Sequence, residues 1–141
     1  DSLLAFLKMH VNRKTPILGV CFGHQILCRL FGGTKILRVS KTPEYGWIKI
    51  DMSASADILK GLPNSFYSLA SHQEEVTQLP EEFQLLASSK DCLIQAFQMK
   101  EAPVFGVQFH PERTLEAANK SFDAMRKAKK HQLFQNQKKS R

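Results

Sequence analysis

The period of hydrophobic and polar positions changes along the chain, and each period predicts a different element. Residues 2–10 repeat apolar side chains every three or four positions, which predicts a helix with one apolar face. Residues 17–20 form a short continuous apolar run, a pattern typical of a strand buried on both faces and therefore of a parallel sheet. A helical period returns at 26–31, and Gly32 and Gly33 end it.

The middle of the chain favours strands over helices. Apolar or alternating runs predict strands at 34–39, 45–50, 64–70, 83–87, 93–99 and 104–109. Turn-forming or polar residues predict a turn at 41–44, a short helical turn at 56–60 and a loop at 71–75. A last helix is predicted from Leu115 to about residue 130, with Thr114 as its N-cap. No internal repeat or linker divides these elements, so we expect one α/β domain.

Composition and charge set the limits of this domain. The chain has 141 residues, 43% of them hydrophobic, which is enough for one domain with its own core. Residues 1–119 hold twelve basic and twelve acidic side chains, whereas residues 120–141 hold eight basic and one acidic, so the end of the chain carries the whole net charge of +7. We therefore predict the domain over 1–131 and a basic polar tail over 132–141.

The basic tail has two interpretations. It can bind an acidic partner such as RNA, a membrane surface or another subunit, or it can be a solvated chain terminus. The charges lack the regular aromatic interleaving that stacking on bases requires, which favours the solvated terminus. A nucleic-acid partner is therefore not predicted, although the tail leaves one open.

The cysteines indicate the compartment. Cys21, Cys28 and Cys92 form neither a CxxC pair nor an even set. Free thiols in a reducing compartment fit this pattern better than a disulfide framework does, so we expect a cytoplasmic protein. No apolar run approaches the roughly 20 residues that a membrane-spanning helix needs, and no membrane association is predicted.

The stretch Gly19-Val20-Cys21-Phe22-Gly23 joins a predicted strand to a predicted helix. A small residue two positions before and two after a nucleophile-capable side chain is what a sharp strand-to-helix turn needs, because larger neighbours would collide there. A cysteine at a helix N-terminus also faces unpaired N–H groups, which favour the thiolate. We interpret Cys21 as a nucleophile. The alternative is a buried core cysteine, which is the interpretation we favour for Cys28 and Cys92.

A base and an acid for this nucleophile are found near the end of the last predicted strand. The strand delivers His110 to the sheet edge and ends there, because Pro111 cannot donate to a ladder. Glu112 is close enough in sequence to accept from one ring nitrogen while the other faces the thiol. Cys21, His110 and Glu112 are therefore a candidate triad.

Two alternatives compete with this triad. His110 can be an ordinary surface histidine at a strand end, and cysteine, histidine and glutamate together can also bind a metal ion. No pair of histidines or cysteines has a metal-ligand spacing, so no metal and no other cofactor is predicted.

Three segments together, 16–25, 71–76 and 106–112, resemble in order and spacing the class I (triad) glutamine amidotransferases. The resemblance covers about residues 3–113 and implies an open, mainly parallel sheet flanked by helices in a flavodoxin-like three-layer fold. It also implies that Cys21 attacks the side-chain amide of glutamine, forms a γ-glutamyl thioester and releases ammonia. His110 would act as base and then acid, oriented by Glu112.

The resemblance also assigns substrate contacts. The backbone N–H of Phe22 would be one oxyanion donor, a role that needs only the turn after the nucleophile. Contacts to bound glutamine would come from Gln25 and from the predicted loop, through Ser71, His72 and Gln73. The alternatives are a solvent-facing Gln25 and an ordinary polar loop.

Other members of the family begin with a further strand-helix section, whose glycine-containing loop supplies the second oxyanion donor. No counterpart precedes Asp1. Either the chain is a fragment of a longer protein or the domain is naturally short. We favour a domain that is incomplete at its N-terminus, and we expect it to lack full activity by itself.

Within the family, Tyr45-Gly46-Trp47, residues 71–76 and Leu86-Ala87-Ser88-Ser89 with Cys92 most resemble the amidotransferase part of GMP synthase and its stand-alone relatives. A separate synthetase subunit would then receive the ammonia. Two other functions stay open: a γ-glutamyl peptidase or hydrolase, which would use the same triad on a larger substrate, and a non-catalytic regulatory binding protein of the same fold.

Overall fold

The computed structural model describes residues 2–120, 122–124 and 126–127. The chain falls into two compact units, one ending at His110 and the other beginning at Pro111. The predicted tail at 132–141 lies outside the described residues.

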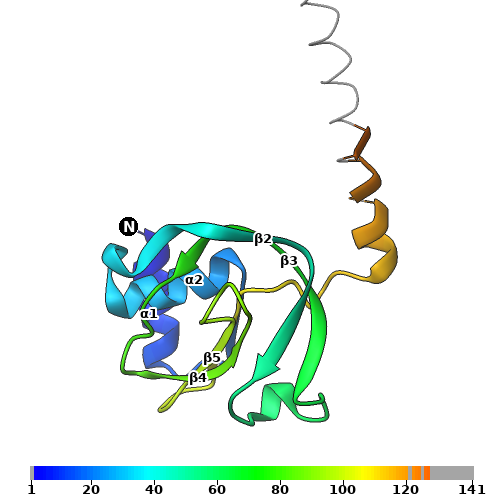
Figure 1. Ribbon diagram of the computed structural model, residues 1–141. Coiled ribbons are helices and arrows are strands. Elements are labelled where there is room, and N and C mark those ends of the chain that lie inside the picture. Colours follow the sequence, from blue (N-terminus) through cyan, green and yellow to red (C-terminus); the bar gives the residue numbers. More distant parts are fainter. Residues whose placement is uncertain (1, 121, 125, 128–141) are drawn as a thin grey trace, which may run out of the picture. The chain divides into compact units, whose positions relative to one another are not determined.

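The first unit is built on a six-stranded sheet with the order β1-β6-β5-β4-β2-β3. Its long strands β2 and β3 lie side by side in Figure 1. Its elements in chain order are α1 (Ser2–Asn12), β1 (Ile17–Val20), α2 (Phe22–Gly32), the 3₁₀ turn η1 (Thr34–Ile36), β2 (Leu37–Met52), the 3₁₀ turn η2 (Asp57–Leu59), β3 (Ser65–Val76), β4 (Phe83–Ser88), β5 (Ala96–Met99) and β6 (Val104–Val107). The predicted α/β class is confirmed.

The sheet is mixed, whereas the sequence led us to expect a mainly parallel one. Among the described strands, only β1 and β6 pair in parallel. The pairs β2–β3, β2–β4, β4–β5 and β5–β6 are antiparallel. A parallel pair needs a long crossover, while strands joined by short connections return antiparallel. The apolar run at 17–20 therefore predicted its own parallel pairing correctly but not that of the strands after it.

Two predictions made from polar residues, a turn and a loop, are wrong. The expected turn at 41–44 lies inside β2, where the pairing with β3 shifts register between Val39 and Glu44. The expected loop at 71–75 is the end of β3, with Ser71 opposite Tyr45 and His72 opposite Glu44. The polar side chains of these segments find partners on the neighbouring strand, which removes the usual reason for polar residues to form a loop.

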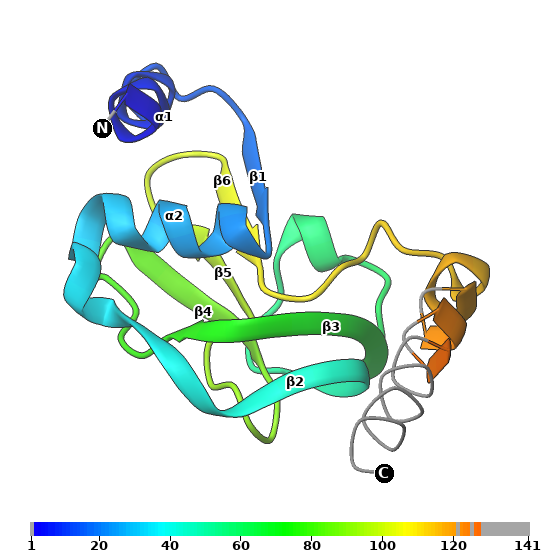
Figure 2. The ribbon, with the colours of Figure 1, turned by 90° about the horizontal axis from the view of Figure 1, so that it is seen from above.

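Buried apolar side chains form two clusters, and helix α2 lies over the first of them. Helix α2 packs against β1 and β6, and α1 packs against α2 (Figure 2). The cluster beneath these helices includes Val11, Leu27, Cys28, Ile36, Val76, Phe83, Ile94, Phe97 and Val104. A second cluster contains Ile50, Leu59 from η2, Leu86, Ala87, Ala96, Val107 and Phe109. The first cluster contains residues of both helices and of the strands β5 and β6, so it joins the helices to the sheet.

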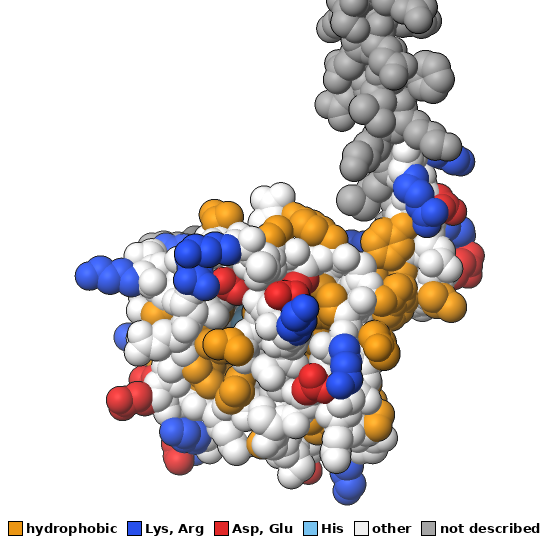
Figure 3. Space-filling model, in the orientation of Figure 1, with side chains coloured by type: hydrophobic (Ala, Val, Ile, Leu, Met, Phe, Trp, Pro, Cys, Tyr) orange, Lys and Arg blue, Asp and Glu red, His pale blue; other side chains and the backbone are white. Residues whose placement is uncertain are grey.

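In the second unit, residues 115–120, 122–124 and 126–127 are helical. The Thr114 Oγ1 accepts a hydrogen bond of 3.2 Å from the Ala117 N–H, which confirms the predicted N-cap. In the part of the chain that the structure describes, no helix is long and apolar enough to cross a membrane. Basic and acidic side chains are interspersed on the face of the molecule shown in Figure 3, in line with the balanced charge of residues 1–119.

Candidate active site

Cys21 sits at a strained turn between β1 and α2. Its φ of 51° and ψ of −101° lie in a region that residues with a side chain rarely adopt. Two hydrogen bonds hold it there: the Cys21 N–H donates to the Val107 carbonyl at 2.8 Å, and the Cys21 carbonyl accepts from the Gln25 N–H at 3.2 Å. The predicted strand-to-helix turn is present, with the cysteine at its apex.

The two glycines that flank the turn meet different requirements. A Cβ on Gly19 would lie 2.5 Å from the backbone carbon and oxygen of Gly23 and 2.7 Å from the Leu27 Cδ1. A Cβ on Gly23 would meet no atom within 4 Å. The expectation that crowding requires both glycines therefore holds for Gly19 alone, because the strand there touches the helix backbone.

The parallel pairing of β1 and β6 brings His110 to the same edge of the sheet as Cys21. Val20 pairs with Val107, so the residues that follow the two strands leave the sheet side by side. The His110 N–H then donates to the Leu69 carbonyl of β3 at 2.8 Å, which ties this segment to the opposite end of the sheet order. Glu112 belongs to the second unit, and its place in a triad stays a prediction.

A second glutamine, which the sequence interpretation missed, lies at the thiol. The Gln108 Nε2 donates to the Cys21 Sγ at 3.6 Å, and the Gln108 side chain is fully buried. Its Oε1 accepts from the Gln25 Nε2 at 3.1 Å. Gln108 is the one polar side chain in the otherwise apolar run 104–109. This exception to the pattern could have indicated Gln108 as a site residue.

Gln25 is buried, so the solvent-facing alternative is excluded. Its Nε2 donates to the Glu74 carbonyl at 2.9 Å as well as to Gln108. Both of these bonds are made within the protein. Direct contact of Gln25 with a substrate, which the resemblance implied, stays a prediction.

On β3, side chains alternate between the two faces of the strand. Ser71 and Gln73 are exposed, whereas His72 points inward and is buried. The Cys21 Sγ lies 4.0 Å from the Ser71 carbonyl, which places the backbone of Ser71 beside the thiol. Of the three predicted contacts on this segment, Ser71 and Gln73 remain accessible to a substrate.

The inward side of β3 carries a buried polar cluster centred on Glu44. The His72 Nε2 lies 2.9 Å from the Glu44 Oε2, and the His72 Nδ1 lies 3.0 Å from the Glu74 carbonyl. Glu44 also accepts from the Ser89 Oγ at 2.6 Å and the Gln95 Nε2 at 2.5 Å. Glu44 was not predicted as a site residue, because its partners are far away in the sequence.

Three residues of this cluster are of types that bind metal ions. One ligand atom each from Glu44, His72 and Cys92 lies within 4.8 Å of the others. Both carboxylate oxygens and both ring nitrogens are already engaged in hydrogen bonds, and burial raises the pKa of the Cys92 thiol to about 12. The cluster is therefore a hydrogen-bonded network.

The remaining thiols and one histidine are core residues. Cys28 is buried, and burial raises the pKa of its thiol to about 12. Because Cys92 is buried as well, Cys21 is the one partly exposed cysteine of the three. His24 is fully buried and its ring lies 4.8 Å from that of Phe97. Burial, and then the charge of His72, lower the pKa of His24 to about 3, and the Ile94 backbone offsets part of this effect. No well-formed hydrogen bond reaches either ring nitrogen within the described residues.

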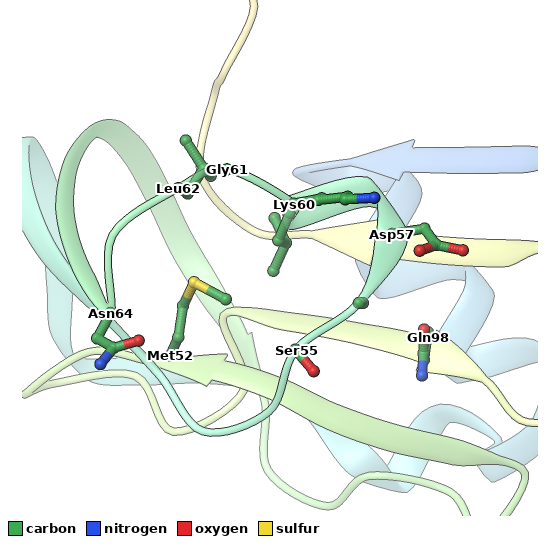
Figure 4. A pocket seen from close by; sticks show the side chains of 10 residues that line it. Met52, Ser55, Asp57, Lys60, Gly61, Leu62, Asn64 and Gln98 are labelled. Carbon is green, nitrogen blue, oxygen red and sulfur yellow. The ribbon is translucent and has the colours of Figure 1, made fainter.

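A cavity of about 590 Å³ lies elsewhere in the first unit, at the segment that connects β2 to β3 (Figure 4). None of the residues predicted for the site lines it. Its walls are formed by Met52, Ser55, Ala56, Asp57, Leu59, Lys60, Gly61, Leu62, Asn64 and Gln98. The cavity is therefore separate from the surroundings of Cys21.

Comparisons with known proteins agree with the geometry. The family model described as glutamine amidotransferase class-I matches residues 2–126. The chain is 45% identical over 102 residues to a glutamine-hydrolyzing GMP synthase subunit of Methanococcus vannielii, covering 72% of this chain and 53% of the relative. The corresponding protein of Pyrococcus abyssi is 45% identical over 99 residues, covering 70% of this chain and 52% of the relative.

A solved structure shows the same fold. A glutamine amidotransferase from Thermotoga maritima superposes with a TM-score of 0.80 at 19% identity, covering 93% of this chain and 55% of that structure. The chain spans about half the length of the curated relatives it matches.

Proposed function

Because the chain belongs to the class-I glutamine amidotransferase family, we propose that it hydrolyses the side-chain amide of glutamine and supplies the ammonia to a synthetase partner. The observation that carries this proposal is Cys21 itself. It is a partly exposed cysteine with a positive φ, at the start of a helix and at the same sheet edge as His110. A buried structural cysteine has no need of such a backbone conformation.

The proposed reaction has two halves. The Cys21 thiolate attacks the amide carbon of the glutamine side chain, the carbon–nitrogen bond breaks, and His110 gives a proton to the departing nitrogen, which leaves as ammonia. A γ-glutamyl thioester remains on the sulfur. His110 then takes a proton from water, which attacks the thioester and releases glutamate and the thiol. Glu112 is proposed to hold the imidazole of His110 in the required orientation.

The backbone at the turn stabilises the charge that develops on the amide oxygen. Phe22 is the first residue of α2, so its N–H belongs to the helix start, where the backbone donors have no partner within the helix. This donor stands directly after the nucleophile and needs no particular side chain. We propose it as one donor of the oxyanion hole.

The direct test is covalent labelling of the thiol. A diazo-ketone analogue of glutamine is expected to add to Cys21, as measured by mass spectrometry of the peptide, and glutamine is expected to prevent the addition. The variant Cys21→Ala should give no adduct and no glutamine hydrolysis, whereas Cys28→Ala, at a buried core cysteine, should still be labelled at Cys21. A full chain that folds but takes no adduct would contradict the proposal.

The same preparation separates the neighbouring functions. Turnover of γ-glutamyl peptides in preference to free glutamine would indicate a peptidase. Unchanged glutamine hydrolysis after Cys21→Ala would remove the catalytic role altogether. For the partner, a GMP synthase synthetase subunit without its own amidotransferase is expected to use glutamine as its nitrogen source only when this chain is added.

A further inference from the structure

Hydrogen bonds connect the thiol of Cys21 to a buried ion pair on β2 and β3. The chain of contacts runs from the Cys21 Sγ to Gln108, then to Gln25 and to the Glu74 carbonyl. It continues from that carbonyl to His72 and ends at Glu44. Apart from Cys21, the residues whose side chains form this chain of contacts are at most 6% exposed. Such a buried network has one well-defined set of donors and acceptors.

The orientation of each amide in this network follows from one backbone carbonyl. The Glu74 carbonyl can only accept, so the Gln25 side chain must turn its NH₂ group toward it. The same NH₂ group donates to the Gln108 oxygen, which fixes that amide as well. The NH₂ group of Gln108 is thereby left facing the Cys21 Sγ, where it can only donate.

The ion pair holds the Glu74 carbonyl in place. Both ring nitrogens of His72 face oxygen acceptors, one being the Glu74 carbonyl and the other the Glu44 carboxylate. The His72 Nε2 lies 2.9 Å from the Glu44 Oε2, which is the geometry of an ion pair. Ser89 and Gln95 donate to the same carboxylate, so the pair is fully hydrogen-bonded although buried.

We propose that Gln108 is a catalytic residue that stabilises the thiolate of Cys21 by donating a hydrogen bond to its sulfur, and that Gln25, His72 and Glu44 are positioning residues that fix this donor. The inference rests on the proposed role of Cys21 as a nucleophile. A donor at the sulfur strengthens when the sulfur becomes negative, since hydrogen bonds to charged groups are the stronger kind. The amide therefore favours the thiolate over the thiol, and it cannot itself accept the proton.

The pH dependence of alkylation measures this effect without any glutamine chemistry. Cys28 and Cys92 are buried, so iodoacetamide reacts at Cys21 in the native full chain, and the rate follows the thiolate fraction. In Gln108→Met the apparent pKa of Cys21 is expected to rise by about one unit, which slows alkylation about tenfold at pH values below that pKa. Gln108→Glu retains the shape but places a carboxylate at the sulfur, and its rise should be larger.

Two further variants test whether the shift in the pKa of Cys21 depends on the hydrogen bond from Gln108. Gln25→Met leaves Gln108 intact but free to rotate, so we expect a smaller rise in the same direction, about threefold in rate. Gln98→Met is the matched control, because the Gln98 Nε2 donates to another glutamine, Gln84, at 2.9 Å on the same sheet. This control should leave the alkylation profile unchanged. Thermal unfolding of each variant shows whether the fold is retained.

The result that would overturn the inference is an alkylation profile in folded Gln108→Met that coincides with that of the unmodified chain. If this variant does not fold, Gln108→Glu and Gln25→Met decide the matter by the same criterion. Glutamine hydrolysis by Gln108→Met should recover at high pH, where the thiolate forms without help. A shifted profile in a chain that hydrolyses no glutamine would refute the proposed function and the catalytic role of Gln108, and would leave only the hydrogen bond from Gln108 to the thiolate standing.

Discussion

His24 gives the sharpest quantitative prediction, because it is fully buried and its ring nitrogens have no well-formed hydrogen bond to any described residue. Its pKa is lowered from 6.5 to about 3, first by burial and then by the charge of His72. In the unfolded chain His24 is therefore protonated below pH 6.5, whereas in the folded chain it is protonated only when the pH falls to about 3. The stability that results is fully present above pH 6.5 and is lost as the pH falls through this window.

The size of the loss follows from the two pKa values. Between pH 8 and pH 5, the single proton on His24 lowers the free energy of unfolding by about 2 kcal/mol, and by about 4 kcal/mol once pH 3 is reached. For a chain of this size, about 2 kcal/mol corresponds to a fall of roughly 8 °C in Tm.

The variant His24→Leu removes the titrating group from this fully buried position and replaces it with an apolar side chain. Urea unfolding at pH 8 should show little change in stability, whereas at pH 5 the variant should be more stable than the unmodified chain by about 2 kcal/mol. His10→Leu is the control, since His10 is partly exposed on α1 and lies 3.3 Å from the Thr15 Oγ1. It should retain the loss of stability in acid.

The comparison between the two histidine variants decides the outcome. Carboxylates also titrate in acid, but their contribution is common to all three chains and cancels in the difference. If the unmodified chain and His24→Leu lose the same free energy between pH 8 and pH 5, to within about 0.5 kcal/mol, the explanation by burial is refuted.

Three further outcomes are expected. Gly19→Ala should lower the free energy of unfolding in urea by about 3 kcal/mol, because the added Cβ meets the backbone of Gly23. Gly23→Ala should be neutral, and equal losses in the two variants would contradict the steric explanation. Native chains treated with iodoacetamide near pH 8 should be alkylated at Cys21 alone, as read by mass spectrometry, and Cys28 and Cys92 should react only after denaturant is added; fast native labelling of either would be inconsistent with their raised pKa values. Glu44→Leu should destabilise the chain by about 4 kcal/mol in a urea melt, since His72, Ser89 and Gln95 would all lose their buried carboxylate partner, and a loss below about 1 kcal/mol would exclude a stabilising role for this carboxylate.

Local patterns predicted the part of the site that depends on neighbouring residues. The apolar strand, the glycine two positions before Cys21 and the helical period after it are contiguous, so the turn could be recognised from the sequence. The same holds for the N-cap at Thr114. Each of these features is stabilised by contacts within a few residues, which is the range over which a sequence pattern carries information.

Features that depend on distant partners were missed. The polar residues at 41–44 and 71–75 indicated a turn and a loop, yet Glu44 and His72 are strand residues that satisfy each other across two neighbouring strands. The position of Gln108 at the thiol follows from the pairing of β1 with β6, and no pattern around residue 108 reveals that pairing. Buried polar groups in strands are difficult to predict because their partners are chosen by the sheet.

The pairing of β1 with β6 also has a consequence for the order in which the protein is made. Among the described strands, β1 has β6 as its sheet partner, and the hydrogen bond between Cys21 and Gln108 spans 87 positions of sequence. A growing chain on the ribosome carries Cys21 long before the residues that shape its turn exist. The surroundings of the Cys21 thiol are therefore complete only when synthesis has passed β6, so an interrupted product that ends before that strand has the cysteine without its hydrogen-bonded turn.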